Sequence, residues 1–333
     1  MKIVADPIDR LLLDDWQRDF PIISQPFVEL AQTLDITEAD VLARLERMRK
    51  SGRITRVGAT CAPNTVSAST LAAVAAPPER VEEVAAIIGQ EPGVNHSYER
   101  EDRWNLWFVA TGPDRDHVNA TLARIETRTG LRVLDLQLVR PFNVDLGFKL
   151  IGGDGLKGAP PRARPVDCSA LKAGDQDILQ ALTKGMALVS RPYGELAQAL
   201  GQSEAGILDR VQCLTDAGII SRLGVIVRHR ALGWRANAMV VWDIPHDQIT
   251  TAGPKLAAQQ GVTLCYERTP VDGVWPYRLY SMFHARSQGE ALENLKNAAQ
   301  IPELAGVRHQ ALFSTRCFKQ TGAMITAPKE SAA

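Results

Sequence analysis

The sequence predicts an α+β fold made of two copies of one plan, each a winged helix-turn-helix followed by a ferredoxin-like sandwich of order βαββαβ. The first observation is a duplication: residues 9–58 align without a gap on residues 175–224, because 175 − 9 = 166 and 224 − 58 = 166. The second is periodicity, since helical spacing of apolar residues gives way to alternating strand and helix patterns in each copy. The third is the stretch "IGGDGLKGAPPRARPVD", whose Gly and Pro content is typical of a linker.

Each copy begins with three predicted helices and a short strand. The second helix reads "PFVELAQTL" in one copy and "PYGELAQAL" in the other, with Ser24 and Ser190 as the expected N-caps. Thr37 and Ser203 are the expected N-caps of the third helix. The strands "RITRVGAT" and "IISRLGVIV" then complete a winged helix-turn-helix over residues 9–60 and again over residues 171–228.

The remainder of each copy alternates strands and helices, over residues 68–150 and residues 235–325, with the linker at residues 151–170. Such a sheet carries its helices on one face, so its other face is an exposed apolar patch unless something covers it. The simplest cover is the sheet of the other copy. We therefore expect a pseudo-twofold pair of halves with a binding cleft between the two sheets.

Composition and charge argue against several classes of protein. The 333 residues carry 38 basic and 38 acidic side chains, so no large net field attracts nucleic acid. No apolar run is long enough for a membrane span, and "MKIVADPIDR" lacks the apolar core of a signal peptide. The five cysteines are scattered without the spacing of a zinc site. We expect a reduced, cytoplasmic chain with no metal held by protein alone, and the sequence leaves both a monomer and a homodimer open.

Two strand motifs carry the residues that suit chemistry. They are "HSYEREDRWNLWFV" (residues 96–109) and "LCYERTPVDGVWPYRLYSMFHAR" (residues 264–286). Because side chains alternate along a strand, His96, Tyr98 and Arg100 share one face. The same count places Tyr266 with Arg268, and Arg278 with Tyr280, Met282 and His284. Further candidates are Trp107 in the first motif, Arg140 and Arg316 at the ends of the last strands, and Arg56 and Arg222 in the wings.

The order of helix-turn-helix and βαββαβ units resembles that of the Lrp/AsnC regulators, and the two motifs are more specific. The His-x-Tyr, Arg and Asn-Leu-Trp-Phe pattern of the first motif resembles one subunit type of siroheme decarboxylase. The Cys-Tyr-x-Arg, Trp-Pro-Tyr and downstream His of the second motif resemble the companion subunit type. The likeness extends over nearly the whole chain, which therefore resembles the fused two-subunit form of that family.

The resemblance implies a carboxy-lyase that converts sirohaem to 12,18-didecarboxysirohaem by releasing two acetate carboxyl groups as CO2. The product would enter haem or haem d1 synthesis, with the enzymes of those routes as partners. The resemblance also implies that no redox cofactor is added, because the iron arrives within the substrate.

The residue types match this chemistry. Loss of CO2 requires a proton donor near neutral pH, for which histidine is suited, while arginine forks suit carboxylates and aromatic walls suit a flat macrocycle. With the resemblance, we assign catalysis to His284, His96, Tyr266 and Arg278, and give His284 or His96 an alternative role as ligand of the substrate iron. Substrate binding is assigned to Tyr98, Arg100, Trp107, Arg140, Arg268, Tyr280, Arg316, Arg56 and Arg222. Because the first copy lacks a counterpart of His284, we favour one site built on His284, Arg278 and Tyr266 and completed from the first half.

Each assignment has a structural alternative. A histidine on a strand, such as His96, is commonly structural, and Trp107 and Tyr280 would also suit plain sheet core. Arg100 and Arg268 would also suit solubilising positions on an edge strand. The remaining histidines are treated as background: His117, His229, His246 and His309.

Two other functions are compatible with the predicted fold. A DNA-binding Lrp/AsnC-type regulator is disfavoured, because the third helices offer few basic side chains for phosphates and two unlike copies suit a palindromic operator poorly. A tetrapyrrole carrier without catalysis would use the same cleft, and only turnover separates it from an enzyme.

Overall fold

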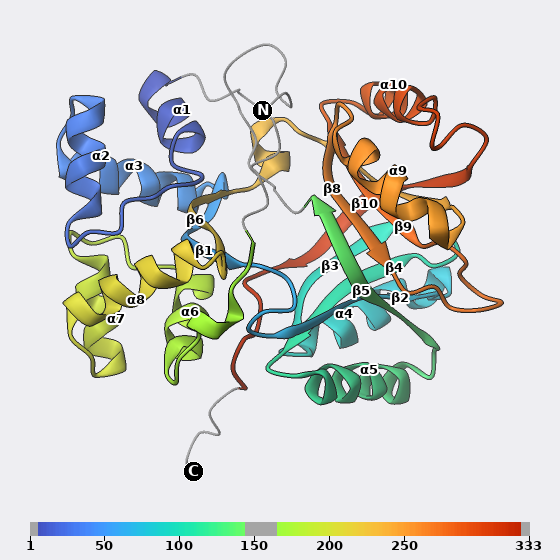
Figure 1. Ribbon diagram of the computed structural model, residues 1–333, viewed down its shortest axis with the longest axis horizontal. Coiled ribbons are helices and arrows are strands. Elements are labelled where there is room, and N and C mark those ends of the chain that lie inside the picture. Colours follow the sequence, from blue (N-terminus) through green and yellow to red (C-terminus); the bar gives the residue numbers. More distant parts are fainter. Residues whose placement is uncertain (1–5, 144–164, 328–333) are drawn as a thin grey trace.

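The computed structural model describes residues 6–143 and 165–327, which form two lobes (Figure 1). One lobe contains the helix-turn-helix units of both copies, and the other contains both βαββαβ units. Each lobe is therefore built from both halves of the sequence. The expected pairing of the two halves is confirmed.

The helical lobe follows the predicted order of elements twice. Thr37 and Ser203 are the N-caps of α3 and α8, as expected. Ser24 and Ser190 were the wrong N-caps for α2 and α7, because the next residue in each copy holds that position. The elements are α1 (Pro7–Asp14), α2 (Pro26–Leu34), α3 (Glu38–Lys50) and β1 (Ile54–Cys61), then α6 (Asp175–Lys184), α7 (Pro192–Leu200), α8 (Glu204–Asp216) and β6 (Ile220–Val227).

The two wing strands pair with each other rather than within their own copies. β1 and β6 run antiparallel with Gly58 opposite Gly224, and 224 − 58 = 166, so the pseudo-twofold axis passes through this pair. Both positions require glycine, since a Cβ at Gly58 would lie 2.3 Å from Leu182 O and one at Gly224 would lie 2.4 Å from Trp16 O. These two contacts are themselves equivalent, because 182 − 16 = 166. Each wing thus packs against the first helical segment of the other copy.

The second lobe contains the βαββαβ units in the predicted order. Short 3-10 helices join several elements: η1 (Pro78–Arg80), η2 (Cys168–Ala170), η3 (His229–Leu232) and η4 (His246–Gln248). The first unit is β2 (Ala68–Val74), α4 (Val81–Gln90), β3 (Val94–Arg100), β4 (Leu106–Gly112), α5 (Arg115–Thr129) and β5 (Val133–Asn143); the second is β7 (Ala236–Asp243), α9 (Ile249–Ala257), β8 (Val262–Arg268), β9 (Leu279–Ala285), α10 (Gln288–Ala298) and β10 (Arg308–Gln320).

The last strand of each unit crosses to the sheet of the other. β5 pairs with β2 through residues 133–137 and then with β8 through residues 138–143. β10 pairs with β7 through residues 308–313 and then with β3 through residues 314–320. The result is a closed antiparallel barrel of order β10-β3-β4-β2-β5-β8-β9-β7. The sequence predicted two facing sheets, and the structure shows that their last strands join them.

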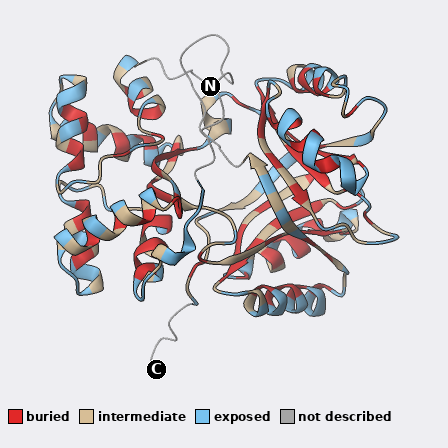
Figure 2. Ribbon diagram, viewed as in Figure 1, coloured by how far each residue is buried: buried red, intermediate tan, exposed pale blue. Residues whose placement is uncertain are grey.

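Burial follows the predicted layers (Figure 2). Two apolar clusters lie between a sheet and its own helices, and a third lies between the two sheets. Trp107, Tyr280 and Trp275 belong to the third cluster, so the inner sheet faces cover each other as expected. The outer faces of α5 and α10 are exposed.

The sandwich domains were predicted to begin at residues 68 and 235. β2 begins at Ala68 and β7 at Ala236, while residues 144–150 and most of the predicted linker lie outside the described residues. Beyond β10 the chain returns to the helical lobe, where Ile325 is 1% exposed within its core. In the described ranges, no helix combines the length and apolarity that a membrane crossing requires.

Candidate functional site

The motif residues expected to share a face do so. Tyr98 pairs with Trp107 across β3 and β4, and Tyr266 pairs with Tyr280 across β8 and β9. Trp107 and Tyr280 lie in the core between the sheets, so both tyrosines and their neighbours two residues away face the barrel interior. The core alternative for Trp107 and Tyr280 therefore fits their positions, at 1% and 2% exposure.

A chain of hydrogen bonds connects the two halves at His284. Arg100 Nη1 donates to Asn237 Oδ1 at 3.3 Å, and Asn237 Nδ2 lies 2.8 Å from His284 Nε2. On the other side of the ring, Thr263 Oγ1 lies 2.8 Å from His284 Nδ1. This series of hydrogen bonds thus runs from β3 of the first half to β7, β9 and β8 of the second half. It places His284 beside Arg100 of the first motif.

The surroundings of His284 favour its neutral form. Burial lowers its pKa to about 3, and the charges of Arg100 and Arg230 act in the same direction. The ring of His229 lies 5.4 Å from that of His284, centroid to centroid. Because both ring nitrogens of His284 are hydrogen-bonded, this arrangement does not support the alternative role of His284 as a ligand of iron.

His96 lies at the opposite end of the same inner face. It is half-buried, and its ring stacks at 6.4 Å from that of Tyr98. Burial lowers the pKa of His96 to about 4, and the charge of Arg56 contributes. Arg56 comes from the wing strand β1, so the helical lobe supplies part of this site. Arg100 lies four positions beyond His96 on the extended strand, so their Cα atoms are about 13 Å apart.

Several buried arginine atoms have no protein partner. The Nε atoms of Arg56, Arg100 and Arg268 are buried and meet no hydrogen-bond acceptor among the described residues. Nor does any described carboxylate form an ion pair with Arg100, which is 6% exposed. Burial lowers the pKa of Arg100 to about 10, so it remains a cation near neutral pH. A buried cation without a counter-charge is costly, so the chemistry of these positions suits an anionic ligand.

The other half repeats the frame without the histidines. Tyr266 and Arg268 are the equivalents of Tyr98 and Arg100, since 266 − 98 = 168 and 268 − 100 = 168. Leu264 stands where His96 would be (264 − 96 = 168), and Thr111 stands where His284 would be (284 − 111 = 173). His96 and His284 therefore belong to one of two pseudo-equivalent faces. We call the face of His96, Tyr98, Arg100 and His284 the histidine face. We call the face of Leu264, Tyr266, Arg268 and Thr111 the counterpart face.

The expected grouping of His284 with Tyr266 and Arg278 was wrong. His284 lies four residues beyond Tyr280, the strand partner of Tyr266, which separates them by about 13 Å along β9. Arg278 precedes β9 and lies about 20 Å from His284 by the same count. The structure instead brings His284 together with Arg100 and its neighbour Tyr98.

Arg140 and Arg316 also differ from expectation. Arg140 Nε donates to Glu267 Oε2 at 2.6 Å, and Glu267 alternates with Tyr266 and faces the helices. Arg316 pairs with Glu82 of α4 and lies 3.8 Å from Glu99. Both guanidinium groups therefore lie on the helix-covered side and not at a cleft between the sheets. The cause is the alternation of side chains along β5 and β10, which points Arg140 and Arg316 away from the barrel interior.

Arg222 keeps its equivalence with Arg56 in the second wing, because 222 − 56 = 166. It is half-buried and lies opposite Thr60 in the β1–β6 ladder. Its role in substrate binding stays a prediction.

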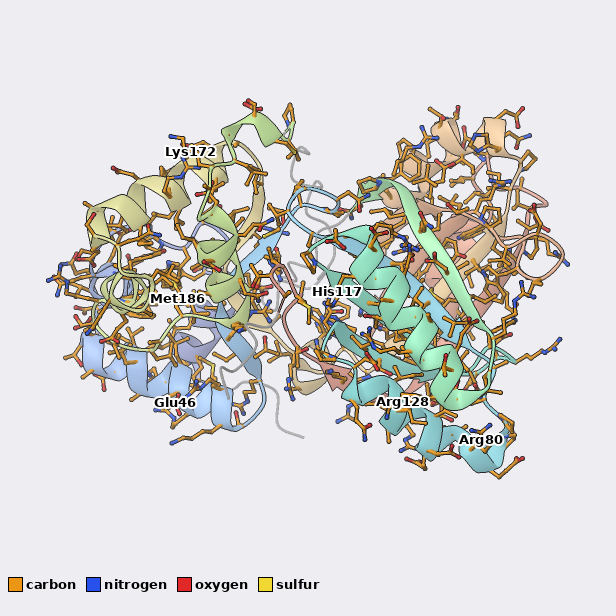
Figure 3. All side chains as sticks on the ribbon, turned by 90° about the horizontal axis from the view of Figure 1, so that it is seen from below. Glu46, Arg80, His117, Arg128, Lys172 and Met186 are labelled. Atoms are coloured by element: carbon orange, nitrogen blue, oxygen red, sulfur yellow. The ribbon has the colours of Figure 1, made fainter. Side chains whose placement is uncertain are left out.

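Sequence reasoning missed four residues of the histidine face: Asn237, Thr263, His229 and Arg230. Asn237 lies on β7, outside the two motifs, and Thr263 lies on β8 one residue before the second motif; the strand pairing brings both to His284. His229 was treated as background, although η3 places it against His284. By contrast, the background assignment of His117 fits its place on α5 in the outer helical layer (Figure 3).

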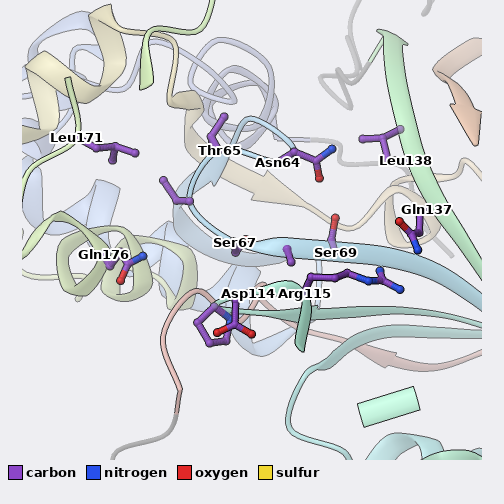
Figure 4. A pocket seen from close by; sticks show the side chains of 13 residues that line it. Asn64, Thr65, Ser67, Ser69, Asp114, Arg115, Gln137, Leu138, Leu171 and Gln176 are labelled. Carbon is purple, nitrogen blue, oxygen red and sulfur yellow. The ribbon is translucent and has the colours of Figure 1, made fainter. Parts of the chain in front are cut away.

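A hollow of about 460 Å³ lies on the counterpart side (Figure 4). Ser69 and Asn64 line it, and they are the equivalents of Asn237 and Arg230, because 237 − 69 = 168 and 230 − 64 = 166. Arg115 at its wall already pairs with Asp135. The hollow therefore lacks the uncompensated cations and the histidines of the histidine face.

No group of three or more His, Cys, Asp or Glu side chains in residues 6–143 and 165–327 is placed to hold a metal ion. The ionisable side chains of the histidine face include two imidazoles and two guanidinium groups with lowered pKa values: His96, His284, Arg56 and Arg100. This set can bind carboxylates and move a proton.

In a comparison with known protein families, two family models match the chain, and each of them matches once in the first half and once in the second. The AsnC-like ligand binding domain matches residues 66–142 and 231–319. The siroheme decarboxylase NirDL-like HTH domain matches residues 9–54 and 175–220. These ranges repeat the duplication seen in the sequence.

Among solved structures, the chain is similar to the crystal structure of the siroheme decarboxylase NirDL. The TM-score is 0.67 at 28% identity, over 96% of this chain and 94% of that one. A second crystal structure of NirDL, with the same degree of similarity, is a co-complex with an iron-uroporphyrin III analogue.

Among curated proteins, the chain is 54% identical over 328 residues to the siroheme decarboxylase NirDL subunit of Paracoccus pantotrophus, covering 97% of this chain and 98% of that one. It is 30% identical over 309 residues to the siroheme decarboxylase of Hydrogenobacter thermophilus, covering 91% and 90%. Likeness of this degree over almost the full length shows that the chain belongs to the siroheme decarboxylase family, in its fused NirDL form.

Proposed function

We propose that the chain decarboxylates sirohaem, releasing two acetate carboxyl groups as CO2 to give 12,18-didecarboxysirohaem for haem d1 or haem synthesis. The observation that carries this proposal is a pair of arginines on the histidine face, Arg56 and Arg100, whose Nε atoms are buried and meet no acceptor within the described residues. A macrocycle with many carboxylates supplies the missing acceptors. The family of the chain supplies the reaction class.

The arginines orient the substrate. Arg100 already donates to Leu312 O at 2.9 Å, which fixes its plane and leaves Nε for a ligand carboxylate. Arg56 approaches the other end of the face from the wing strand. Tyr98 and His96 lie between these two cations and present stacked rings to a flat ligand.

His284 supplies the proton. As the carboxyl group leaves, the bond between the methylene and carboxyl carbons breaks, its electron pair stays on carbon, and one proton replaces each CO2. Substrate carboxylates that neutralise Arg100 and Arg230 remove one of the causes that lower the His284 pKa. The pKa of His284 then rises, so the ring takes up a second proton and becomes an imidazolium acid only when substrate is present.

The test is anaerobic incubation of the chain with sirohaem, without any added cofactor, followed by mass spectrometry. Loss of two CO2 units supports the enzyme, and accumulation of the mono-decarboxylated species would show the first step. Sirohaem that binds tightly and stays unchanged would instead support a carrier. Absence of binding would contradict both.

The structure gives a physical reason to disfavour the regulator. The wings pair with each other, and Arg44 of α3 and Arg210 of α8 are committed to Asp9 and Asp175. These pairs are equivalent, since 210 − 44 = 166 and 175 − 9 = 166. A gel-shift experiment on the neighbouring promoter at physiological salt tests this, and specific retention would favour the regulator.

The proposal keeps three further expectations from the sequence. The iron belongs to the substrate and no redox cofactor is needed, the chain works in the cytoplasm, and it meets the enzymes of haem or haem d1 synthesis, either alone or as a homodimer. Turnover without added cofactor tests the first, and light scattering on the purified chain tests the oligomeric state.

A further inference from the structure

The orientation of the Asn237 amide is fixed by its neighbour. Arg100 Nη1 is a donor without any acceptor lone pair, so the Asn237 atom at 3.3 Å from it is the oxygen Oδ1. The amide nitrogen Nδ2 then faces His284 at 2.8 Å. The reverse orientation would set two donors against each other at Arg100.

The tautomer of His284 follows from this orientation. Because Asn237 Nδ2 only donates, His284 Nε2 is the acceptor and carries no proton. The proton of the neutral ring lies on Nδ1, which donates to Thr263 Oγ1 at 2.8 Å. The Thr263 hydroxyl in turn donates to Met282 O at 3.1 Å, so the hydrogen on His284 Nδ1 and the hydroxyl hydrogen of Thr263 both have acceptors.

We infer that Asn237 is a positioning residue that fixes the Nδ1–H tautomer of His284 and couples it to Arg100. Its consequence for catalysis rests on the proposed function. A proton can enter His284 only at Nε2, the atom that Asn237 occupies, so the amide must turn before the ring becomes an acid. The amide can turn once a substrate carboxylate takes Arg100 away from Oδ1.

Three charged or titratable side chains surround this switch from two elements: Arg100 on β3, and His229 and Arg230 on η3. The two guanidinium groups have no acceptor atom, so neither Arg100 nor Arg230 can accept an Asn237 amide hydrogen. The counterpart face has no such device, because Ser69, Thr111 and Asn95 stand in place of Asn237, His284 and Thr263. Ser69 therefore offers a matched control position on an equivalent strand.

The experiment reads the tautomer directly. Long-range ¹H–¹⁵N correlation spectra of histidine-labelled protein distinguish protonated from unprotonated ring nitrogens, with His284 assigned by comparison with His284→Ala. The full chain without substrate should show protonated Nδ1 and unprotonated Nε2. In Asn237→Asp, an isosteric carboxylate accepts from Arg100 and from the ring, so Nε2 should become protonated.

Kinetics give the second readout. Asn237→Ala should lower kcat for sirohaem by roughly tenfold or more while KM stays close to the wild-type value. Thr263→Ser should restore the activity lost in Thr263→Val, because it returns the hydroxyl. Ser69→Ala should change neither the spectrum nor the kinetics.

Three results would overturn the inference: a wild-type ring protonated at Nε2, an unchanged tautomer in Asn237→Asp, or a loss in Asn237→Ala confined to KM. The wild-type spectrum needs no variant, so a folding defect in any variant leaves the test standing. If wild-type chain did not turn over sirohaem, the proposed function would fail while the tautomer result could still hold.

Discussion

The histidine face and the counterpart face share one frame and differ in what can ionise. Both keep Tyr and Arg two residues apart on the inner side of a strand, and each arginine donates to a carbonyl of a last strand, Arg100 to Leu312 and Arg268 to Leu136, both at 2.9 Å. Only the histidine face carries imidazoles. A duplicated fold thus supplies two equal frames, and a few side chains decide which frame can bind and protonate.

The arginines of the two faces also differ in their surroundings. Arg268 lies over two rings, 5.1 Å from the centroid of Tyr266 and 5.9 Å from that of Tyr280. Arg100 contacts one ring, that of Tyr98 at 5.7 Å, and its Nη1, which donates to Leu312 O, also donates to Asn237 Oδ1. Arg268 therefore packs on two rings and Arg100 on one ring and an amide, while the Nε atom of each is buried and meets no acceptor among the described residues.

The largest predicted effect comes from removing His284, the side chain that most distinguishes the histidine face from the counterpart face. His284→Ala should lower kcat for sirohaem by about 10²–10⁴-fold, the usual contribution of a positioned acid. The matched variant Thr111→Ala should keep near wild-type turnover, because Thr111 has no proton to give near neutral pH. Steady-state kinetics under anaerobic conditions measure both, and comparable losses in the two variants would contradict the assignment of one active face.

The second effect is a dependence of stability on pH. The pKa values of His96 and His284 in the folded chain are about 4 and about 3, below the ordinary 6.5. The unfolded chain therefore binds more protons below pH 6.5, so stability is complete above that value and is lost as the pH falls towards 4. Each histidine contributes on the order of 3 kcal/mol at most.

Urea unfolding between pH 7.5 and 4.5 measures this loss. His96→Gln and His284→Gln should each flatten the profile. Leu264 and Thr111 do not titrate in this range, so the counterpart face should contribute nothing. A wild-type profile that stays flat below pH 6 would show that the imidazoles are better solvated than their burial implies.

The third effect separates the two arginines. Arg100→Lys keeps the charge but removes the fork, and should weaken sirohaem binding by about tenfold. Arg268→Lys should leave binding nearly unchanged and instead lower the thermal midpoint, because the lysine loses contact with the rings of Tyr266 and Tyr280. Absorbance titration and thermal unfolding give the two readouts. Weaker binding in Arg268→Lys alone would reverse the roles of the faces.

The sequence predicts the fold well because the fold rests on local signals that repeat. The offset of 166 residues predicted the duplicated helices, and Thr37 and Ser203 marked the start of α3 and α8. Strand parity correctly placed Tyr98 with Arg100 and Tyr266 with Arg268 on inner faces. These predictions need only the geometry of one helix or one strand.

The site was predicted less well because it depends on pairing between distant strands. β10 crosses from β7 to β3, and this crossover brings Arg100 to Asn237 and His284. Parity alone grouped His284 with Arg278, which shares its face but lies at the other end of the strand. No local pattern distinguishes Asn237 or Thr263 from any other polar residue on a strand.

The smallest predicted effect concerns Arg316, which sequence reasoning assigned to the substrate. Its ion pair with Glu82 is on the surface, with side-chain exposures of 49% and 72%, so Arg316→Ala should change the stability very little. Sirohaem affinity should not change, because the guanidinium lies on the helix-covered side. Arg140→Ala is the equivalent variant, and it should cost more stability because, among the described residues, it leaves the buried carboxylate of Glu267 with His246 as its remaining ion-pair partner. A loss of sirohaem affinity in Arg316→Ala would mean that the ligand reaches round the end of β10, and the boundary of the histidine face would then have to include the outer side of that strand.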